Sequence, residues 1–417
     1  MKQRYRELTH ELCVRAVLEC FDEKWRRCDV LPVVEKYGGV NLGSLMRDFE
    51  TSSWNVRLEA AESIACELEQ RVLDLLDGDK DALELEPVVL RIRPDGMTGK
   101  LREIADLCVW HQLAGHLVQL GLAPLFDARM EWGQCASLPG RGQSGLKRRV
   151  ERWLRRKGLG IRCAQKSDVH HAYGSLHYGV CVELVRREAP SAAWILATMQ
   201  AIAEIAPGGH LIIGGYLDAW LFNFAMSYAL RYVLSLAKER RGHRVPLVIR
   251  AATHMDDFAL LGRRRADVLS ATRKLARWME RELHLTLKPG SIVEFVSLEE
   301  EHRRRKLTRP SERGCPCLDM GGYRMRRSYT TVRGCIWLRA RRSFLRAGEE
   351  AARTGTMRVC RSRRLGAYYG YYKNSNSRKA AEKVNADALI RLAGRVTGFV
   401  ASMQTMKERS RQCFIYA

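Results

Sequence analysis

Residues 247–261 read Leu-Val-Ile-Arg-Ala-Ala-Thr-His-Met-Asp-Asp-Phe-Ala-Leu-Leu, and this stretch decides the fold. Two apolar, β-prone runs flank the acidic pair Asp256 and Asp257. The pattern predicts a hairpin that carries both carboxylates at or beside its turn. Two carboxylates ~4 Å apart repel by about 4 kcal/mol at an effective dielectric near 20, and a bound cation would relieve that repulsion. A solvated Asp-Asp turn is the simpler explanation of an isolated pair, so other parts of the chain must decide.

A third carboxylate lies upstream, on a segment with strand character. Residues 161–173 predict a strand that delivers Asp168, and Tyr173 follows five residues later. Two divalent ions about 3.5–4 Å apart, which stabilise the attacking and leaving oxygens of an in-line displacement, require carboxylates from separate strands. Asp168 and the Asp256-Asp257 pair are candidates for these ligands.

The composition predicts a folded protein of two or three subdomains. The chain has 417 residues, of which 46% are hydrophobic. Four of its first seven residues are charged, which argues against a signal peptide. The longest apolar stretch, 216–233, is interrupted by polar residues and is no candidate membrane span. We therefore expect a cytoplasmic protein that does not bind a membrane.

Cysteine usage agrees with a reducing compartment. The 13 cysteines are odd in number and scattered through apolar stretches, as expected of reduced, buried thiols. The only tight pair, Cys315 and Cys317, lacks a second pair or a histidine at zinc spacing. We interpret these cysteines as structural.

Basic charge is concentrated near the C-terminus. The net charge is +24, and residues 301–417 hold 28 Lys and Arg against 8 Asp and Glu, a balance of +20. A polyanion is the expected partner. Interleaved aromatic residues favour nucleic acid over a membrane surface, because they can pack against sugars or bases.

Helices are predicted in the N-terminal third. Apolar residues recur at helical spacing over 8–21 and over 56–76, the second run after Ser52-Ser53 as a plausible N-cap and before Asp77-Gly78-Asp79 as its end. A further helix is expected over 104–122.

Two basic segments follow. Lys100 and Arg102 share one face of a predicted strand, an arrangement suited to gripping a triphosphate. A glycine-rich loop over 134–143 precedes a basic amphipathic helix that begins at Gly145. The basic face of this helix is either exposed to solvent or binds the phosphates of a nucleic-acid backbone.

Taken in order, these motifs resemble those of bacterial reverse transcriptases. In that family an Asp-bearing strand with an aromatic residue five positions on precedes a glycine-containing turn, a helix with Asn and an Asp-Asp hairpin. The matching residues here are Asp168 and Tyr173, Gly214 and Asn223, and Asp256-Asp257. Residues 99–104 are similar to the fingers motif, 139–143 to the template-side loop, 318–324 to the primer-grip hairpin and 368–376 to a thumb signature. The resemblance covers roughly residues 88–380.

The resemblance implies an α+β, right-hand polymerase fold. Its expected parts are an N-terminal helical section (1–90) on the fingers, fingers (91–165), a palm with an antiparallel sheet (166–300), and a primer-grip hairpin with a basic helical thumb (301–417).

The resemblance also implies the chemistry. Asp168, Asp256 and Asp257, with the carbonyl of Val169, would hold two Mg²⁺ ions, with Mn²⁺ as a substitute. A primer 3′-hydroxyl, or a protein hydroxyl in a self-priming enzyme, would attack the α-phosphate of a deoxynucleotide on an RNA template. The residues implied for nucleotide binding are Lys100, Arg102, Tyr173, which would exclude a 2′-hydroxyl, and Gly214. Those implied for template or primer are Arg141, Gln143, Asn223, Gly322 and Tyr323.

The implied partners are an RNA template, nascent DNA and deoxynucleoside triphosphates, with a cognate non-coding RNA as a further candidate. Oligomerisation is left open. The biological setting implied is phage defence or a mobile genetic element.

The sequence departs from the family pattern at three places. His254 stands where members carry another aromatic residue, Ile212-Ile213 where many carry Pro-Gln, and Gly215 where a small polar residue is usual. These changes put templated synthesis in more doubt than the polymerase chemistry. Two alternatives remain: a template-independent or RNA-synthesising polymerase, and a non-catalytic, maturase-like RNA-binding protein.

Overall fold

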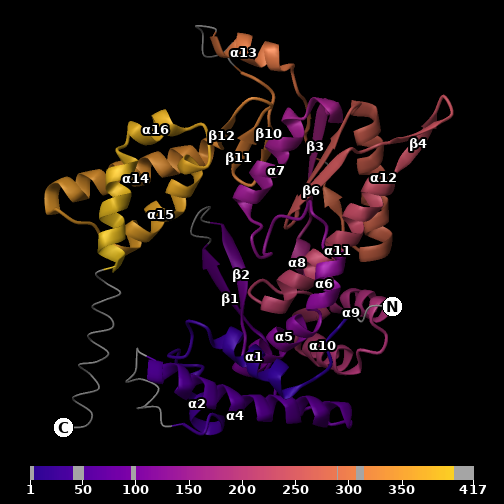
Figure 1. Ribbon diagram of the computed structural model, residues 1–417, viewed down its shortest axis with the longest axis vertical. Helices are drawn as coiled ribbons and strands as arrows, with labels where there is room; N and C mark the ends of the chain where they lie inside the picture. Colours follow the sequence, from indigo (N-terminus) through magenta and orange to yellow (C-terminus); the bar gives the residue numbers. More distant parts are fainter. Residues whose placement is uncertain (1–3, 41–50, 95–99, 289, 307–313, 399–417) are drawn as a thin grey trace. The chain divides into compact units, whose positions relative to one another are not determined.

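The computed structural model describes residues 4–40, 51–94, 100–288, 290–306 and 314–398, with only the backbone for 51–54. Helices and antiparallel sheets are mixed, so the α+β class is confirmed (Figure 1). The chain divides into two compact units. Unit 1 comprises Met1–Glu131, His170–Ala229 and Trp278–Thr286, and unit 2 comprises Trp132–Val169, Leu230–Arg277 and Leu287–Ala417. Each unit therefore combines segments that are distant in sequence.

Unit 2 contains the main sheet. Its strands are β3 (Cys163–Val169), β6 (Arg250–His254), β7 (Asp257–Gly262), β8 (Leu287–Lys288) and β9 (Ile292–Glu294). Their order is β6-β7-β3-β8, with β9 pairing β3 as well, and every pairing is antiparallel. The predicted hairpin over 247–261 is confirmed, because β6 and β7 pair directly and only two residues connect them. Both strands are largely buried, and β7 is apolar from Phe258 to Leu261.

Two smaller sheets also belong to unit 2. β4 (Ala237–Arg240) pairs β5 (His243–Pro246) as an isolated ribbon. β10 (Leu318–Met320), β11 (Tyr323–Met325) and β12 (Thr330–Val332) form a three-stranded meander. The predicted hairpin at 318–324 is therefore present, with Gly321 and Gly322 in its turn at φ values of +57° and +83°.

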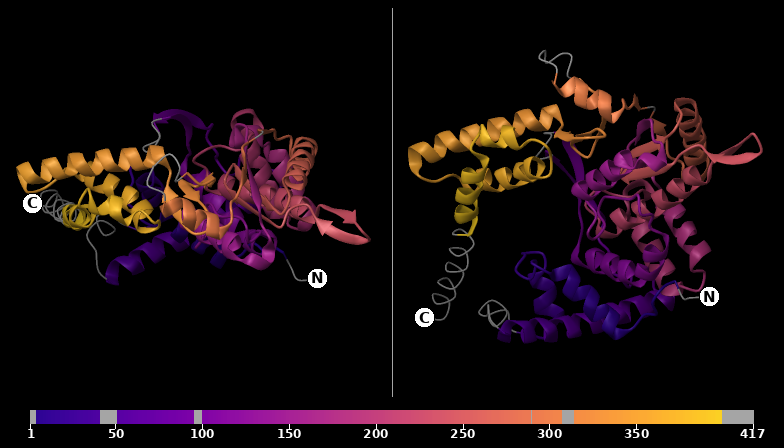
Figure 2. Two further views of the ribbon diagram at one scale, coloured as in Figure 1. Left: turned by 90° about the horizontal axis from the view of Figure 1, so that it is seen from above. Right: turned by 45° about the horizontal axis from the view of Figure 1, so that its top comes forward.

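The helices of unit 2 are mostly C-terminal. They are α7 (Gln143–Arg155), the 3₁₀ turn η1 (Lys157–Leu159), α13 (Leu298–Lys306), α14 (Gly334–Thr354), α15 (Val359–Lys373), α16 (Arg378–Glu382) and helical residues 386–398. α14, the long orange helix of Figure 2, lies beside α15. α7 confirms the predicted basic helix, and its buried Leu146 and Val150 belong to an apolar face on the side of β6.

A buried carboxylate joins α13 to the loop between β11 and β12. The side chain of Glu301 is fully buried and accepts hydrogen bonds from the backbone N–H groups of Arg327 (3.0 Å) and Ser328 (2.8 Å). The Ser328 hydroxyl donates a third bond at 2.7 Å. Because a buried carboxylate without donors is costly, these bonds hold the loop to α13.

Unit 1 is built mainly from helices and contains the hairpin β1 (Val89–Pro94) and β2 (Leu101–Asp106). Its helices are α1 (His10–Phe21), α2 (Leu31–Tyr37), α4 (Thr51–Leu76), α5 (Val109–Gly121), α6 (Ala123–Arg129), α8 (Ala172–Ser175), α9 (Tyr178–Glu188), α10 (Ala193–Ile205) and the 3₁₀ turn η2 (Pro207–Gly209). α11 (Tyr216–Ser235) and α12 (Arg265–Leu283) each contribute residues to both units. The apolar face of α1, which includes Leu12, Ala16 and Phe21, is buried against α4 and α5.

Three local expectations are corrected. Ser52 and Ser53 lie inside α4 rather than before it, so they are no N-cap. The helix expected over 104–122 begins only at Val109, because residues 101–106 pair with β1 and form a strand instead. Among the described cysteines, all of which are free, Cys28, Cys66, Cys335 and Cys360 are exposed rather than buried.

The described helices include none that is both long enough and apolar enough to cross a membrane.

Candidate active site

The three predicted carboxylates meet at one end of the main sheet, within unit 2. Asp168 is the cross-strand partner of Asp257 in the register of β3 and β7. Asp256 lies in the turn that precedes β7, and its carbonyl accepts a hydrogen bond from the Val169 N–H at 3.0 Å. All three aspartates are partly exposed, whereas Val169 is buried. Strands that are nearly a hundred residues apart thus place their acidic residues together.

The turn that presents Asp256 has an unusual backbone. Met255 has a φ of +53°, which is the left-handed region that side chains other than glycine rarely adopt. The hydroxyl of Ser137 donates to the Met255 sulfur at 3.4 Å, and the N–H of Cys135 donates to the carbonyl of Thr253 at 3.0 Å. The loop that follows Trp132 therefore supports the hairpin from its β6 side.

The clustered charges change the protonation of Asp256. Burial, together with the negative charges of Asp168 and Asp257, raises the pKa of its carboxyl to about 6. Burial also lowers the pKa of the neighbouring His254, while the charge of Asp257 opposes that shift. Asp256 thus carries its charge at a cost at neutral pH, and it makes no ion pair within the part of the chain that the structure describes.

A lysine that the sequence analysis missed supplies part of that compensation. Lys166 Nζ lies 2.9 Å from Asp257 Oδ1. Lys166 precedes Asp168 by two residues on β3, so both side chains point to the same face of the sheet. The two-residue spacing was the signal in the sequence.

The fit to a divalent metal rests on Asp168 and Asp256. Among the described residues, no three His, Cys, Asp or Glu side chains are arranged to hold one metal ion together. Asp257 is instead paired with Lys166. Mg²⁺ is commonly bound by one or two carboxylates, with water and substrate phosphates as its other ligands. An all-oxygen pair that carries excess negative charge suits such an ion.

A second lysine lies on the other side of Asp168. In the register of β3 and β8, Lys288 is the cross-strand partner of Asp168, and it is exposed. Lys288 thus places a second positive charge beside this carboxylate.

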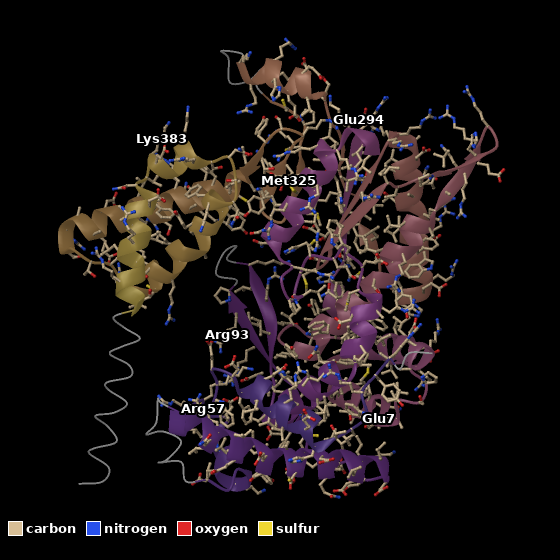
Figure 3. All side chains as sticks on the ribbon, viewed as in Figure 1. Glu7, Arg57, Arg93, Glu294, Met325 and Lys383 are labelled. Carbon is tan, nitrogen blue, oxygen red and sulfur yellow. The ribbon has the colours of Figure 1, made fainter. Side chains whose placement is uncertain are left out.

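The residues predicted to bind nucleotide lie in unit 1, partly on the β1–β2 hairpin. Arg93 lies on β1 (Figure 3). The exposed Arg102 on β2 is its cross-strand partner. Lys100, which is also exposed, comes directly before β2 and two residues before Arg102, so it continues the same face of the strand. Like charges that face each other across a ladder destabilise it, so an anion bound over this face would stabilise the hairpin. Arg93 was missed because only the strand register reveals it.

Gly214 lies against the same hairpin. Its φ is +116°, and a Cβ at this position would lie 3.0 Å from the carbonyl oxygen of Ala105. The N–H of Ala105 donates to the carbonyl of Ile213 at 2.8 Å. The Gly214 turn and β2 are thus held together within unit 1.

Asp218 stabilises this turn from inside α11. Its carboxylate accepts a bond from the Ile212 N–H at 2.8 Å, and burial raises its pKa to about 6. A Cβ on Gly215 would lie 1.8 Å from Asp218 Oδ2, so Gly215 is required by this carboxylate. The departure from the family pattern at Gly215 therefore has a local steric reason.

Tyr173 and Asn223 occupy structural positions in unit 1. The Tyr173 ring stacks on Phe222, with centroids 5.1 Å apart. Asn223 is buried, and its Nδ2 donates to the carbonyl of Ala219 at 2.9 Å. Tyr173 is partly exposed and can contact a ligand at its edge.

The predicted template and primer residues of unit 2 converge on one tyrosine of α15. The Tyr371 hydroxyl donates to Gln143 Oε1 at 2.7 Å, and its ring lies 5.2 Å from that of Tyr323. A Cβ on Gly322 would lie 2.5 Å from the Tyr371 ring. Tyr323 is itself buried, so this cluster joins α7, the β10–β11 hairpin and α15. Arg141 is half-buried in the glycine-rich loop.

No known protein-family model matches the chain, and no curated protein sequence matches it either. The reverse transcriptase resemblance therefore stays a prediction from the motifs.

Proposed function

We propose that the chain is a nucleotidyltransferase of the reverse transcriptase kind, which adds deoxynucleotides to a primer on an RNA template. The observation that supports this most is the convergence of Asp168, Asp256 and Asp257 from β3 and the β6–β7 hairpin. A solvated Asp-Asp turn would not require a third carboxylate from another strand, nor would it raise the pKa of one member.

Asp168 and Asp256 would hold Mg²⁺, with the Val169 carbonyl as a further candidate ligand. Bound Mg²⁺ ions supply charge neutralisation for the attacking hydroxyl, the transferring phosphate and the leaving pyrophosphate. Asp257 would join the ligands once its ion pair with Lys166 opens. Released from Asp257, Lys166 would keep a positive charge on the same face of the sheet, where phosphate oxygens accumulate charge.

Unit 1 would bind the nucleotide. Arg93, Lys100 and Arg102 form a cationic face on the β1–β2 hairpin, and guanidinium groups bind phosphate oxygens in pairs. The exposed edge of Tyr173 would contact the sugar and select deoxynucleotides. Gly214 would let the chain approach the nucleotide closely, since it has no side chain.

The basic helices of unit 2 would contact the nucleic acid. Exposed basic residues lie along α14 and α15, among them Arg339, Arg342, Arg346, Arg363 and Arg364. Exposed arginines on one helical subdomain are typical of binding to a phosphate backbone. In this proposal the main sheet serves as palm, the β1–β2 hairpin as part of the fingers and α14–α16 as thumb.

A non-catalytic RNA-binding protein is the second candidate, and the ion pair between Lys166 and Asp257 favours it. A lysine that neutralises one carboxylate permanently would leave a folded scaffold without full metal-binding capacity. The two candidates differ in whether the carboxylates are needed for any activity.

Incorporation of labelled deoxynucleotides and ribonucleotides on a primed RNA template with Mg²⁺ tests the proposal. We expect deoxynucleotide extension by the unaltered protein and at least a 100-fold loss in Asp168→Asn, because a lost metal ligand removes charge stabilisation in the transition state. Asp127→Asn, which alters an exposed aspartate of α6, is the matched control. RNA binding without any incorporation would contradict the enzyme and support the binding protein. Extension with ribonucleotides alone would make the product RNA.

A further inference from the structure

The β4–β5 ribbon stands apart from the other sheets of unit 2. Within the described part of the chain, β4 and β5 pair only with each other. The ribbon projects outward from β6 and β7 in Figure 1, and both views of Figure 2 show the same. Isolated two-stranded ribbons have little core of their own. Its sequence is therefore free to serve a surface interaction.

The outer end of this ribbon is strongly basic. Arg240, Arg241 and His243 are all exposed there, and the flanking pair of Glu239 and Arg244 is exposed as well. Across the described residues, neither Arg240 nor Arg241 makes an ion pair. The register places Glu239 opposite Arg244 and Arg240 opposite His243, so Arg240 and Arg241 are adjacent positive charges that face no carboxylate across the ribbon. Charges arranged in this way repel unless an anion lies between them.

Arg241 occupies a turn position that disfavours arginine. The turn consists of Arg241 (φ +50°) and Gly242 (φ +74°), so both of its residues are left-handed. Two-residue hairpin turns of this kind prefer Asn-Gly, because asparagine tolerates positive φ far better than long side chains do. Arg241 therefore holds a backbone conformation that asparagine or glycine would adopt at lower cost.

The inner end of the ribbon is anchored by other residues. Lys238 forms an ion pair with Asp267 of α12. The Leu247 N–H donates to the carbonyl of Leu236 at 2.9 Å, and Arg244 Nη2 donates to the Ser235 carbonyl at 3.4 Å. Lys238 is thus neutralised within the fold, whereas the charges at the turn remain exposed. The ribbon is held at its base and presents its basic turn to a partner.

We infer that the turn of the β4–β5 ribbon is a nucleic-acid contact that binds backbone phosphates through Arg240 and Arg241. Arginine is suited to this because its planar guanidinium meets two phosphate oxygens at once. A two-stranded ribbon is also narrow enough to enter the ~12 Å major groove of B-form DNA. The residues of this contact are distinct from the candidate carboxylates and from the basic residues of α14–α16, and the contact does not depend on polymerase activity.

Arg241→Asn separates a binding role from a structural one. Asparagine suits the turn, so we expect the variant to unfold at the same temperature as the unaltered protein or higher. Each lost phosphate contact reduces the slope of log affinity against log salt by about 1 and weakens binding about five-fold at moderate salt. The double variant Arg240→Gln/Arg241→Asn should lose about twice that slope.

Binding is measured by fluorescence anisotropy over a range of salt concentrations with duplex DNA, duplex RNA and single-stranded RNA of equal length. A loss with any of them supports the contact and identifies the nucleic acid that it binds. Arg187→Gln, which removes an exposed arginine paired with Glu183 on α9, is the charge-matched control. Affinities unchanged for all three probes would overturn the inference. Co-sedimentation with phosphatidylserine vesicles is measured in parallel. A loss confined to the vesicles would also overturn the inference and would assign the ribbon to a membrane surface.

Discussion

Replacing Asp256 by asparagine removes a negative charge that the folded protein holds at a cost. The pKa of the Asp256 carboxyl is about 6 in the folded protein against an ordinary value of 3.8, because burial and the charges of Asp168 and Asp257 disfavour ionisation. At neutral pH the carboxylate is ionised in both the folded and the unfolded chain. The difference then amounts to about 3 kcal/mol of lost stability, reduced to about 2 by partial exposure to solvent.

The pH dependence follows from the direction of the shift. Between pH 3.8 and about 6 the folded protein holds the proton of Asp256 more tightly than the unfolded chain does. The unaltered protein therefore loses stability as pH rises through this window, whereas Asp256→Asn does not. We expect the variant to be about 2 kcal/mol more stable above pH 7, with a gap that closes toward pH 4.

Urea unfolding followed by circular dichroism in the presence of EDTA measures this gap. Addition of Mg²⁺ should narrow it, because the ion stabilises only the protein that keeps its carboxylates. Asp127→Asn, at an exposed position, should show no gap at any pH. The reasoning is refuted if Asp256→Asn is less stable than the unaltered protein at pH 7.5, or if its advantage does not change with pH.

Three further substitutions test other charged groups. Lys166→Met removes the cation 2.9 Å from Asp257. Because such a partly exposed ion pair contributes about 1 kcal/mol, the variant should bind Mn²⁺ about five-fold more tightly. An unchanged Mn²⁺ affinity in an electron paramagnetic resonance titration would show that the lysine does not compete with the metal ion. Arg93→Gln should weaken binding of a deoxynucleoside triphosphate about five-fold, through a lost charge-assisted bond; calorimetry with equal affinities would remove Arg93 from the nucleotide-binding face. Glu301→Gln should lower the free energy of unfolding by about 3 kcal/mol, because a buried side chain that accepts three hydrogen bonds loses its charge. A decrease of less than about 1 kcal/mol in urea unfolding would show that Glu301 does not hold the loop to α13.

Local patterns predicted the elements that carry the candidate active site. The apolar runs on either side of Asp256 and Asp257 predicted the β6–β7 hairpin, and the strand predicted within 161–173 is present as β3 over 163–169. Both strands are buried, so burial and local preference favour the same structure. The prediction failed where local preference and strand pairing conflicted. Residues 104–106 fit the helical periodicity of the segment 104–122, but pairing with β1 makes them a strand.

Composition and periodicity, which are local properties of the chain, were enough to predict the strands and the turn that carry Asp168, Asp256 and Asp257 and the region where basic charge accumulates. Only the tertiary structure decided that Asp168 lies opposite Asp257, that Lys166 neutralises Asp257 and that Arg93 faces Arg102. These relations depend on strand register, and register is set by pairing between segments that are distant in sequence or joined by a turn of unknown length. Charged residues that are far apart in the sequence affect one another's pKa and binding only when strand pairing brings them within a few ångströms of one another.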